Sequence, residues 1–313
     1  MTVKNEDILN HVFQDDVQFL IMNYQSNTLK LDIEISGSTK NMPKYLHQGA
    51  PLVNVAAFCG ALKCTHFLLS SGAKIPTNSS KPLLSECGAA SGLFPMIQLL
   101  QSFNIDMTPG LFTAIELWKN DLFMWMETNI NNNLFATSRF NKRTYIHYAV
   151  LSGNMQAFSY FVNTHKMDPN CIDSEGKTPF FIAVEMKKVD IVQSLFPYPT
   201  INVNKQDNSL NTPLHAAIKN NDIQMVKLLI SNQNINLDSF NNNHQTPLLL
   251  ALESKKMELA QEILNTKRIY PNYPNKTGQV ALHIAAKNNY CDLIPLLLSY
   301  QNIDINRRDS SGV

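Results

Sequence analysis

Apolar residues along this chain recur with helical spacing in pairs of short segments. In one pair, residues 213–218 are mostly apolar, and residues 223–230 carry a stripe of apolar side chains, Met225, Val226, Leu228 and Leu229. The links between pairs are rich in Asn and Asp, as in residues 202–208, which is typical of an extended segment with a tight turn. The pattern predicts helix–turn–helix units, each followed by a projecting loop.

The unit has a constant length in the second half of the chain. The residue before the first helix recurs every 34 positions, at Thr144, Thr178, Thr212, Thr246 and Val280. Looser copies begin at Pro51, Leu83 and Leu111, with spacings of 32, 28 and 33. The third copy is the most degenerate, because Glu127 and Thr128 stand where a leucine pair is usual. We predict three degenerate repeats at 51–143 and five regular ones at 144–313.

Local residue choice supports this division. Thr followed by Pro, as at Thr212–Pro213, suits the cap and the first position of a helix. A residue that tolerates left-handed backbone is expected where the first helix ends, and it is Gly60, Gly92, Gly153, Asn120, Asn221 or Asn289. Lys187 and Lys255 occupy this place in two copies, where we expect less regular turns.

The two ends of the chain lack the complete unit. Residues 1–50 are expected to form a helical N-terminal cap, with Asp15–Asp16 at the start of a helix. Residues 309–313 match the segment that precedes the Thr position elsewhere. We therefore expect a ninth repeat to follow in a longer protein, or the exposed repeat end to pack on another copy.

The unit resembles the ankyrin repeat family, whose Thr-Pro-Leu-His hallmark is complete at Thr212–His215. The Asn richness and degenerate early copies also resemble the expanded ankyrin families of parasitic protists. The resemblance implies an all-α solenoid of stacked helix pairs, with hairpin loops projecting along one edge. It also implies that the histidine of the hallmark, at His147, His215 and His283, ties neighbouring loops together.

No motif in the sequence indicates catalysis. The three histidines lie far apart and have no Cys or second His at ligand spacing, so we expect no metal site. Cys59 and Cys64 with His66 form a weak candidate for a nucleophilic thiol, but Cys64 falls on an apolar helix face. No phosphate-binding Gly-rich loop occurs, so no cofactor is expected. The sequence predicts a protein that is not an enzyme.

Composition limits the class of partner and the cellular compartment that the sequence favours. The net charge of +1 gives no argument for nucleic acid, and no apolar run reaches membrane-spanning length. Five scattered cysteines without a Cys-x-x-Cys motif favour reduced thiols, and therefore a cytoplasmic or nuclear protein. The 36 asparagines point to polar, uncharged loops.

A solenoid offers one concave surface made of hairpin tips and first-helix sides. The expected tip residues are Asn141, Arg143, Ser174, Glu175, Lys177, Asn208, Ser209, Asn211, Asn242, Asn243, Gln245, Lys276 and Thr277. On the helix sides, Phe58 and Trp118 are the expected anchors, with Lys119 beside them, because exposed aromatic rings carry interface energy. The alternative for Trp118 is burial caused by a shifted register.

These residues predict a protein-interaction scaffold that binds a partner protein on this surface. One alternative is a targeting or regulatory arm of a larger protein, whose enzyme or membrane domain lies beyond residue 313. The other is a structural protein that self-associates through uncovered repeat ends.

Overall fold

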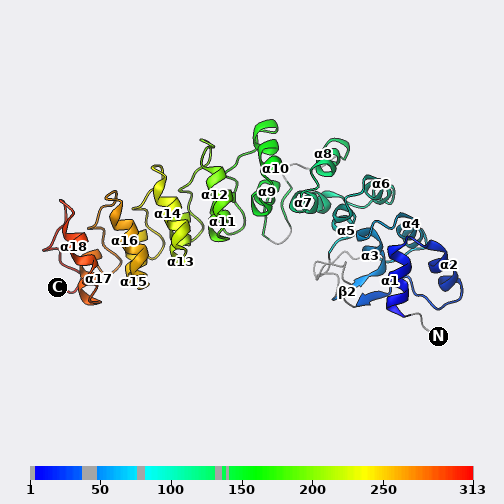
Figure 1. The fold of residues 1–313 in the computed structure, drawn as a ribbon, viewed down its shortest axis with the longest axis horizontal. Coiled ribbons are helices and arrows are strands. Elements are labelled where there is room, and N and C mark those ends of the chain that lie inside the picture. The colour runs from blue at the N-terminus through cyan, green and yellow to red at the C-terminus, as the bar shows by residue number, and fades with distance from the viewer. Residues whose placement is uncertain (1–3, 37–47, 76–81, 131–135, 139–140, 313) are drawn as a thin grey trace. The chain divides into compact units, whose positions relative to one another are not determined.

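The helix pairs expected from the sequence are present in the computed structural model (Figure 1). The structure describes residues 4–36, 48–75, 82–130, 136–138 and 141–312. The chain forms two compact units, Met1–Ser138 (unit 1) and Arg139–Val313 (unit 2). The predicted boundary between degenerate and regular repeats, at residues 143 and 144, lies close to this division.

Unit 1 contains four helix pairs and a short pair of strands. Its elements are α1 Asn5–Phe13, α2 Val17–Gln25, β1 Glu34–Ser36, β2 Gln48–Pro51, α3 Leu52–Phe58, α4 Leu62–Ser70, α5 Leu84–Ser91, α6 Phe94–Ser102, α7 Thr108–Glu116 and α8 Asn120–Asn129. The strands pair antiparallel, with Ile35 opposite Ala50. The sequence predicted the N-terminal helices but not these strands.

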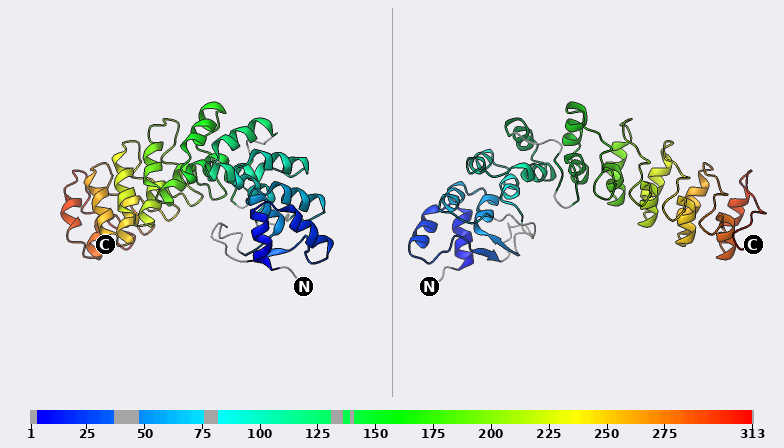
Figure 2. Two further views of the ribbon diagram at one scale, coloured as in Figure 1. Left: turned by 45° about the vertical axis from the view of Figure 1, so that its right-hand side comes forward. Right: turned by 180° about the vertical axis from the view of Figure 1, so that it is seen from behind.

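Unit 2 contains five helix pairs among its described residues. Its elements are α9 Tyr145–Ser152, α10 Met155–Ser159 continued by a π-helical turn Tyr160–Thr164, α11 Pro179–Glu185, α12 Val189–Leu195, α13 Pro213–Lys219, α14 Ile223–Ser231, α15 Pro247–Glu253, α16 Met257–Asn265, α17 Ala281–Lys287 and α18 Leu293–Leu298. First helices pack on first helices, and second helices from α12 onward pack on second helices, in chain order (Figures 1 and 2).

The predicted helix starts are confirmed. The hydroxyl oxygens of Thr178, Thr212 and Thr246 accept the backbone N–H three residues later, at 3.1, 3.4 and 3.3 Å. Pro follows each of them at the first helical position, where a missing N–H costs nothing. These contacts fix where α11, α13 and α15 begin.

The turns between paired helices are more uniform than expected. Lys187 and Lys255 adopt the same left-handed backbone as Asn221, with φ of 59°, 58° and 52°. The expectation of less regular turns at the two lysines is therefore wrong. In each of these turns the next residue donates its N–H to the residue five before it, as Lys188 does to Ala183 O at 2.9 Å. That closing bond, together with helix packing, outweighs the cost of a left-handed lysine.

The third repeat is shifted by two residues relative to the sequence alignment. The left-handed residue is Trp118, with φ of 59°, and Asn120 instead begins α8. The buried positions of α8 are Leu122, Phe123 and Met126, which correspond to Met225, Val226 and Leu229 of α14. Glu127 and Thr128 therefore do not occupy the leucine positions, and the core of this repeat is apolar after all.

Asp15 and Asp16 both cap helices, but different ones. Asp16 accepts the N–H of Phe19 at 3.4 Å at the start of α2. Asp15 instead accepts the N–H groups of Lys63 and Cys64, at 3.2 and 3.0 Å, at the start of α4. Carboxylates at helix N-termini satisfy otherwise unpaired amides. Asp15 thereby bonds the N-terminal segment to the repeat that follows it.

In several repeats one asparagine side chain forms two hydrogen bonds to the loop of the next repeat. We call this pair of bonds the bracket. The side-chain amide of Asn170 donates to Thr200 O at 2.8 Å, and its oxygen accepts the Asn202 N–H at 2.6 Å. Asn204 and Asn272 make the same two bonds to the residues 30 and 32 positions farther along. An amide side chain can donate and accept at the same time, as this arrangement needs. Part of the Asn richness is therefore structural.

Asp238 occupies this bracket position in the repeat between Asn204 and Asn272. It accepts the Tyr270 N–H at 3.0 Å but has no donor for a carbonyl. Burial raises the pKa of the Asp238 carboxyl to about 6. Because the folded form then holds the proton more tightly than the unfolded form, the charged carboxylate weakens the fold at neutral pH.

We expect Asp238→Asn to stabilise the protein at pH 7 by about 1 kcal/mol, since it supplies the missing donor and removes a half-buried charge screened by solvent. The gain should shrink as the pH falls from 7 toward 5, because protonation relieves the wild-type carboxylate. Urea unfolding at both pH values measures this. The matched control, Asn204→Asp, should destabilise. If Asp238→Asn leaves the free energy of unfolding at pH 7 unchanged or lowers it, the bracket interpretation is wrong.

Candidate functional site

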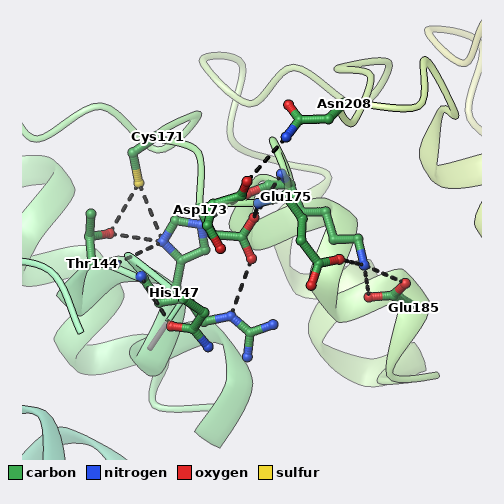
Figure 3. A network of polar contacts seen from close by, with 11 residues as sticks. Thr144, His147, Cys171, Asp173, Glu175, Glu185 and Asn208 are labelled. Carbon is green, nitrogen blue, oxygen red and sulfur yellow. Dashed lines mark hydrogen bonds and ion pairs between the residues drawn. The ribbon is translucent and has the colours of Figure 1, made fainter. Parts of the chain in front are cut away.

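The constant 34-residue spacing of the repeat places a buried histidine against two loops at once (Figure 3). His147, near the start of α9, accepts the Thr144 N–H on Nδ1 at 3.1 Å and donates from Nε2 to Lys177 O at 3.1 Å. His215 repeats this with the Thr212 N–H and Gln245 O, at 3.2 and 3.0 Å. The link between neighbouring loops implied by the resemblance is therefore present in the structure.

These hydrogen bonds determine the protonation state and the tautomer of both rings. Each ring nitrogen of His147 and His215 has a backbone partner, so each ring is the neutral tautomer with its proton on Nε2. Burial lowers the pKa of both histidines to about 4. Neither ring has a free lone pair for a metal ion or an acid–base step.

Cys171 lies beside the first of these rings. Its Sγ is 3.2 Å from Thr144 Oγ1 and 3.8 Å from His147 Nδ1 (Figure 3). Burial raises the pKa of the Cys171 thiol to about 11, and those of Cys59 and Cys64 to about 12. A nucleophilic cysteine needs a lowered pKa, so these three thiols do not have the electrostatics of a catalytic site.

The hairpins that precede the first helices share one construction. Asp173 Oδ1 accepts the N–H groups of Glu175 and Lys177, at 2.9 and 3.0 Å, which holds the loop in a tight turn. Asp207, Asn241 and Asn275 accept the corresponding N–H groups of their own loops. The side chain of the first loop residue therefore shapes each hairpin.

Backbone bonds also join one hairpin to the next. The N–H groups of Ser174, Asn208, Asn242 and Ser310 donate to Asn141 O, Glu175 O, Ser209 O and Thr277 O, at 2.8 to 3.0 Å. The side-chain amides of Asn208 and Asn242 add bonds to Ser174 O and Asn208 O, at 3.1 and 3.4 Å (Figure 3). The hairpins of unit 2 thus form an ordered row.

The structure divides the expected tip residues into two groups. The exposed ones are Ser174, Glu175, Asn208, Ser209, Asn242, Asn243, Lys276 and Thr277. The half-buried ones are Asn141, Arg143, Lys177 and Gln245, and Asn211 is buried with 5% exposure. Asn211 therefore does not project from its loop, because its amide bonds to Asp207 and Lys219.

Lys177 also serves the fold. Its Nζ lies 2.7 Å from Glu175 and 2.8 Å from Glu185 at the end of α11 (Figure 3). Asn211 with Lys219, and Gln245 with Glu253, pair over the same spacing of eight residues. The sequence reasoning missed these helix-end partners, Glu185, Lys219 and Glu253, although the eight-residue spacing could have revealed them.

The three expected residues of unit 1 lie at unlike places. Phe58 is half-buried at the end of α3, and Lys119 is half-buried before α8. Trp118 is 55% exposed, so the shifted register did not bury it. Trp118 lies on the left-handed turn and not on the side of the first helix, where the sequence placed it. The shifted register puts Glu116 and Leu117 at those helix-side positions.

A further exposed residue was not anticipated. Leu210 is 45% exposed on the hairpin tip and has a φ of 55°, at the position that Gly176 occupies one repeat earlier. A left-handed backbone is costly for leucine, since its Cβ crowds the following carbonyl. The sequence carried a signal for this residue, because an apolar side chain stands where Gly176 and Gly278 stand in other repeats.

We expect the neutral histidines to make stability depend on pH. Their folded pKa of about 4 lies below the unfolded value of 6.5, so the unfolded chain binds protons first. Stability is complete above pH 6.5 and falls toward pH 4, by up to about 1.4 kcal/mol per pH unit for each ring.

Urea unfolding between pH 7 and 4.5 measures this loss. The double variant His147→Gln/His215→Gln should be less stable at pH 7 and should lose most of the pH dependence. His66→Gln, which alters an exposed ring, is the control and should keep the slope. An unchanged slope in the double variant contradicts the assignment.

Across the part of the chain that the structure describes, no helix has the length and apolar character needed to cross a membrane. Within the same residues, His, Cys, Asp and Glu do not gather in threes as metal ligands.

Comparisons with known proteins agree with the repeat architecture. The ankyrin repeat domain of Bcl-3, a member of the IκB family, has 19% identity and a TM-score of 0.47, covering 83% of this chain and 90% of its own. An ankyrin repeat domain from Acinetobacter baumannii AYE has 20% identity and a TM-score of 0.51, covering 62% of this chain and 98% of its own. A search of curated protein sequences gave no match.

The family model for ankyrin repeats, which spans three copies, matches residues 88–207 and 214–309. Ankyrin repeats are generally non-catalytic modules for protein–protein interaction. Because the matched residues make up more than half of the chain, this protein belongs to the ankyrin repeat family.

Proposed function

We propose that this chain is an interaction scaffold that binds a partner protein through the exposed hairpin residues of unit 2. This surface, the tip face, consists of Ser174, Glu175, Ser209, Asn243, Lys276 and Thr277. The five free cysteines support a reducing compartment, the cytoplasm or the nucleus, as the place where it acts.

The ordered row of hairpins is the observation that carries this proposal. Backbone bonds of 2.8 to 3.0 Å run from Ser174 to Asn141, from Asn208 to Glu175 and from Asn242 to Ser209. Loops held in this way lose little conformational freedom when a partner binds, so less binding energy is spent on ordering them. A rigid framework with variable exposed side chains is the usual basis of loop-mediated recognition.

The chemistry of the tip face indicates the kind of contact. Short hydroxyl and amide side chains dominate, and the two charges, Glu175 and Lys276, have opposite signs. Such a surface favours hydrogen bonds to a loop or an extended peptide over electrostatic capture. Leu210, exposed within the same row, supplies an apolar contact.

The remaining expected contacts take supporting roles in this proposal. Asn208, Asn242, Asn211, Gln245 and Lys177 hold the hairpins and helix ends in place. Arg143 lies 3.4 Å from Asp173 and braces the first hairpin. Asn141 contributes its carbonyl oxygen to the row.

In unit 1, we propose Trp118 as a separate contact, with Phe58 and Lys119 as weaker ones. The indole is the largest exposed ring of that unit at 55% exposure. Large aromatic side chains anchor interfaces because they bury much apolar area at a low cost in conformational entropy.

Substitution of the tip face should abolish partner capture without unfolding the chain. We expect Glu175→Arg/Ser209→Arg/Thr277→Arg to lose the proteins that the native chain retains in affinity capture with mass spectrometry. Exposed loop substitutions of this kind change stability by about 0.5 kcal/mol or less. Circular dichroism checks that the variant stays folded.

The matched control places the same charges on exposed positions of second helices, Gln224→Arg/Glu258→Arg/Gln261→Arg. This control should capture the same proteins as the native chain. If the control loses them and the tip variant keeps them, the partner binds elsewhere and the proposal is wrong.

We propose self-association through the last repeat as a second candidate. A hollow of about 540 Å³ lies between α17 and the loop after α18. Its lining is mixed, with Leu282, Ala286 and Ile305 beside Arg307 and Arg308, and Ile305 is 63% exposed. Exposed apolar side chains such as Ile305 can pack on another copy of the chain.

Sedimentation over a range of concentrations tests this candidate. The mass of the native chain should rise with concentration. Ile305→Glu should stay monomeric at every concentration. The control Ile172→Glu alters a residue in another loop that is 51% exposed, and it should associate as the native chain does. A native chain that is monomeric at every concentration contradicts the candidate.

A further inference from the structure

Two adjacent arginines precede an exposed serine in the loop after α18. Arg307 and Arg308 lie three and two residues before Ser310, and all three residues are exposed. The chain has five arginines in 313 residues, so composition alone does not explain an adjacent pair at this place. The tip face makes no use of this pair.

The two guanidinium groups are available for recognition. Within the described part of the chain, the two arginines form no hydrogen bond or ion pair. The neighbouring carboxylates have backbone donors instead, since Asp304 accepts the Asn306 N–H at 3.1 Å and Asp309 accepts the Ser311 N–H at 2.9 Å. Each guanidinium group can therefore form a bidentate contact with a carboxylate of another protein.

The hydroxyl group of Ser310 is also available. In the same turn Ser311 Oγ donates to Asp309 at 2.7 Å, whereas Ser310 Oγ has no hydrogen-bond partner among the described residues. Residues 307–309 lie in neither a helix nor a strand. An enzyme that binds this segment in an extended form has to open the turn, which breaks the bonds from Ser310 N–H to Thr277 O and from Gly312 N–H to Asp309 O.

The other hairpins of unit 2 provide an internal comparison. Ser174 is equivalent to Ser310, since both donate their N–H to the preceding hairpin, but Cys171 and Ile172 stand in place of the two arginines. The remaining hairpins have no hydroxyl group at this position, where the residues are Asn208, Asn242 and Lys276. The position is exposed in all five hairpins. Accessibility is therefore a property of the hairpin, whereas the arginine pair with a serine is particular to Ser310.

From these observations we propose that Ser310 is phosphorylated by a serine/threonine protein kinase that recognises an arginine pair. Carboxylates of the kinase hold the guanidinium groups of Arg307 and Arg308, because kinases select substrates by charge pattern. The γ-phosphoryl group of ATP passes to Ser310 Oγ, ADP leaves, and the hydroxyl proton passes to a carboxylate of the kinase.

A phosphate on Ser310 lies beside the tip face. A Cβ atom added to Gly278 would lie 3.0 Å from Ser310 Oγ, so this hydroxyl group lies against the hairpin that carries Lys276 and Thr277. Phosphorylation adds about two negative charges there. It therefore changes the charge at one end of the tip face, and this consequence rests on the proposed function.

The test incubates the full chain with Mg-ATP and the catalytic subunit of cyclic-AMP-dependent protein kinase, which prefers an arginine pair at this spacing. We expect a single phosphate per chain, located on Ser310 by mass spectrometry, and none in Ser310→Ala. Ser174→Ala is the matched control, since it removes the equivalent hydroxyl group, and it should be labelled as the native chain is.

The arginine pair is tested by the rate of labelling. Arg307→Ala/Arg308→Ala should lower kcat/KM about tenfold or more, since it removes two charge-assisted contacts. Arg307→Lys/Arg308→Lys should lie between this variant and the native chain, because lysine keeps the charge but loses the bidentate geometry. The control Lys187→Ala/Lys188→Ala removes another adjacent pair of exposed cations and should leave kcat/KM unchanged. Circular dichroism confirms that each variant is folded.

Four results would overturn the proposal: no labelling of the native chain, labelling that persists in Ser310→Ala, an unchanged kcat/KM in Arg307→Ala/Arg308→Ala, or labelling that requires denaturation. Labelling needs no captured partner, so this test and the capture test of the tip face fail independently. In affinity capture, the phosphorylated chain should retain less of the tip-face partner than Ser310→Ala treated in the same way. Equal retention contradicts the effect on the tip face.

Discussion

Hydrogen bonds from one repeat to the next are the constraint on which unit 2 depends. In a solenoid each repeat packs only against its neighbours, so links between adjacent repeats have to be formed again along the chain. His147 and His215 make it with a buried ring, and Asn170, Asn204 and Asn272 make it with an amide. Both side chains donate to one backbone group and accept from another, which leaves no buried polar atom unpaired at the link.

The same constraint explains which parts of the structure could be predicted. The 34-residue spacing and the Thr–Pro helix starts were readable because each depends on local chemistry, as at Thr212 and Pro213. The turn at Lys187 was not readable, because its left-handed backbone is imposed by the packing of α11 and α12 and not by its own preference. The pairing of β1 with β2 depends on residues far apart in sequence and left no local signal.

The candidate site was predictable only in outline. The sequence located the hairpins, and the exposure of Ser174, Glu175 and Thr277 agrees with that placement. It could not distinguish these residues from Asn211, whose side chain is buried. Asp207 accepts from its amide N–H, and Lys219 donates to its amide oxygen. The placement of Trp118 failed for a different reason. A two-residue shift of register moves every later assignment in a repeat, and degenerate leucine positions in α8 concealed the shift.

A repeat protein provides its own comparison for identifying function, because the same position is sampled in several copies. Where the copies agree, as in the paired bonds of Asn170 and Asn204, the residue serves the fold. Where one copy departs without a structural need, the departure calls for another cause. Leu210 is such a departure, because it is apolar and 45% exposed with a left-handed backbone at the place of Gly176, and the proposed partner contact supplies a cause.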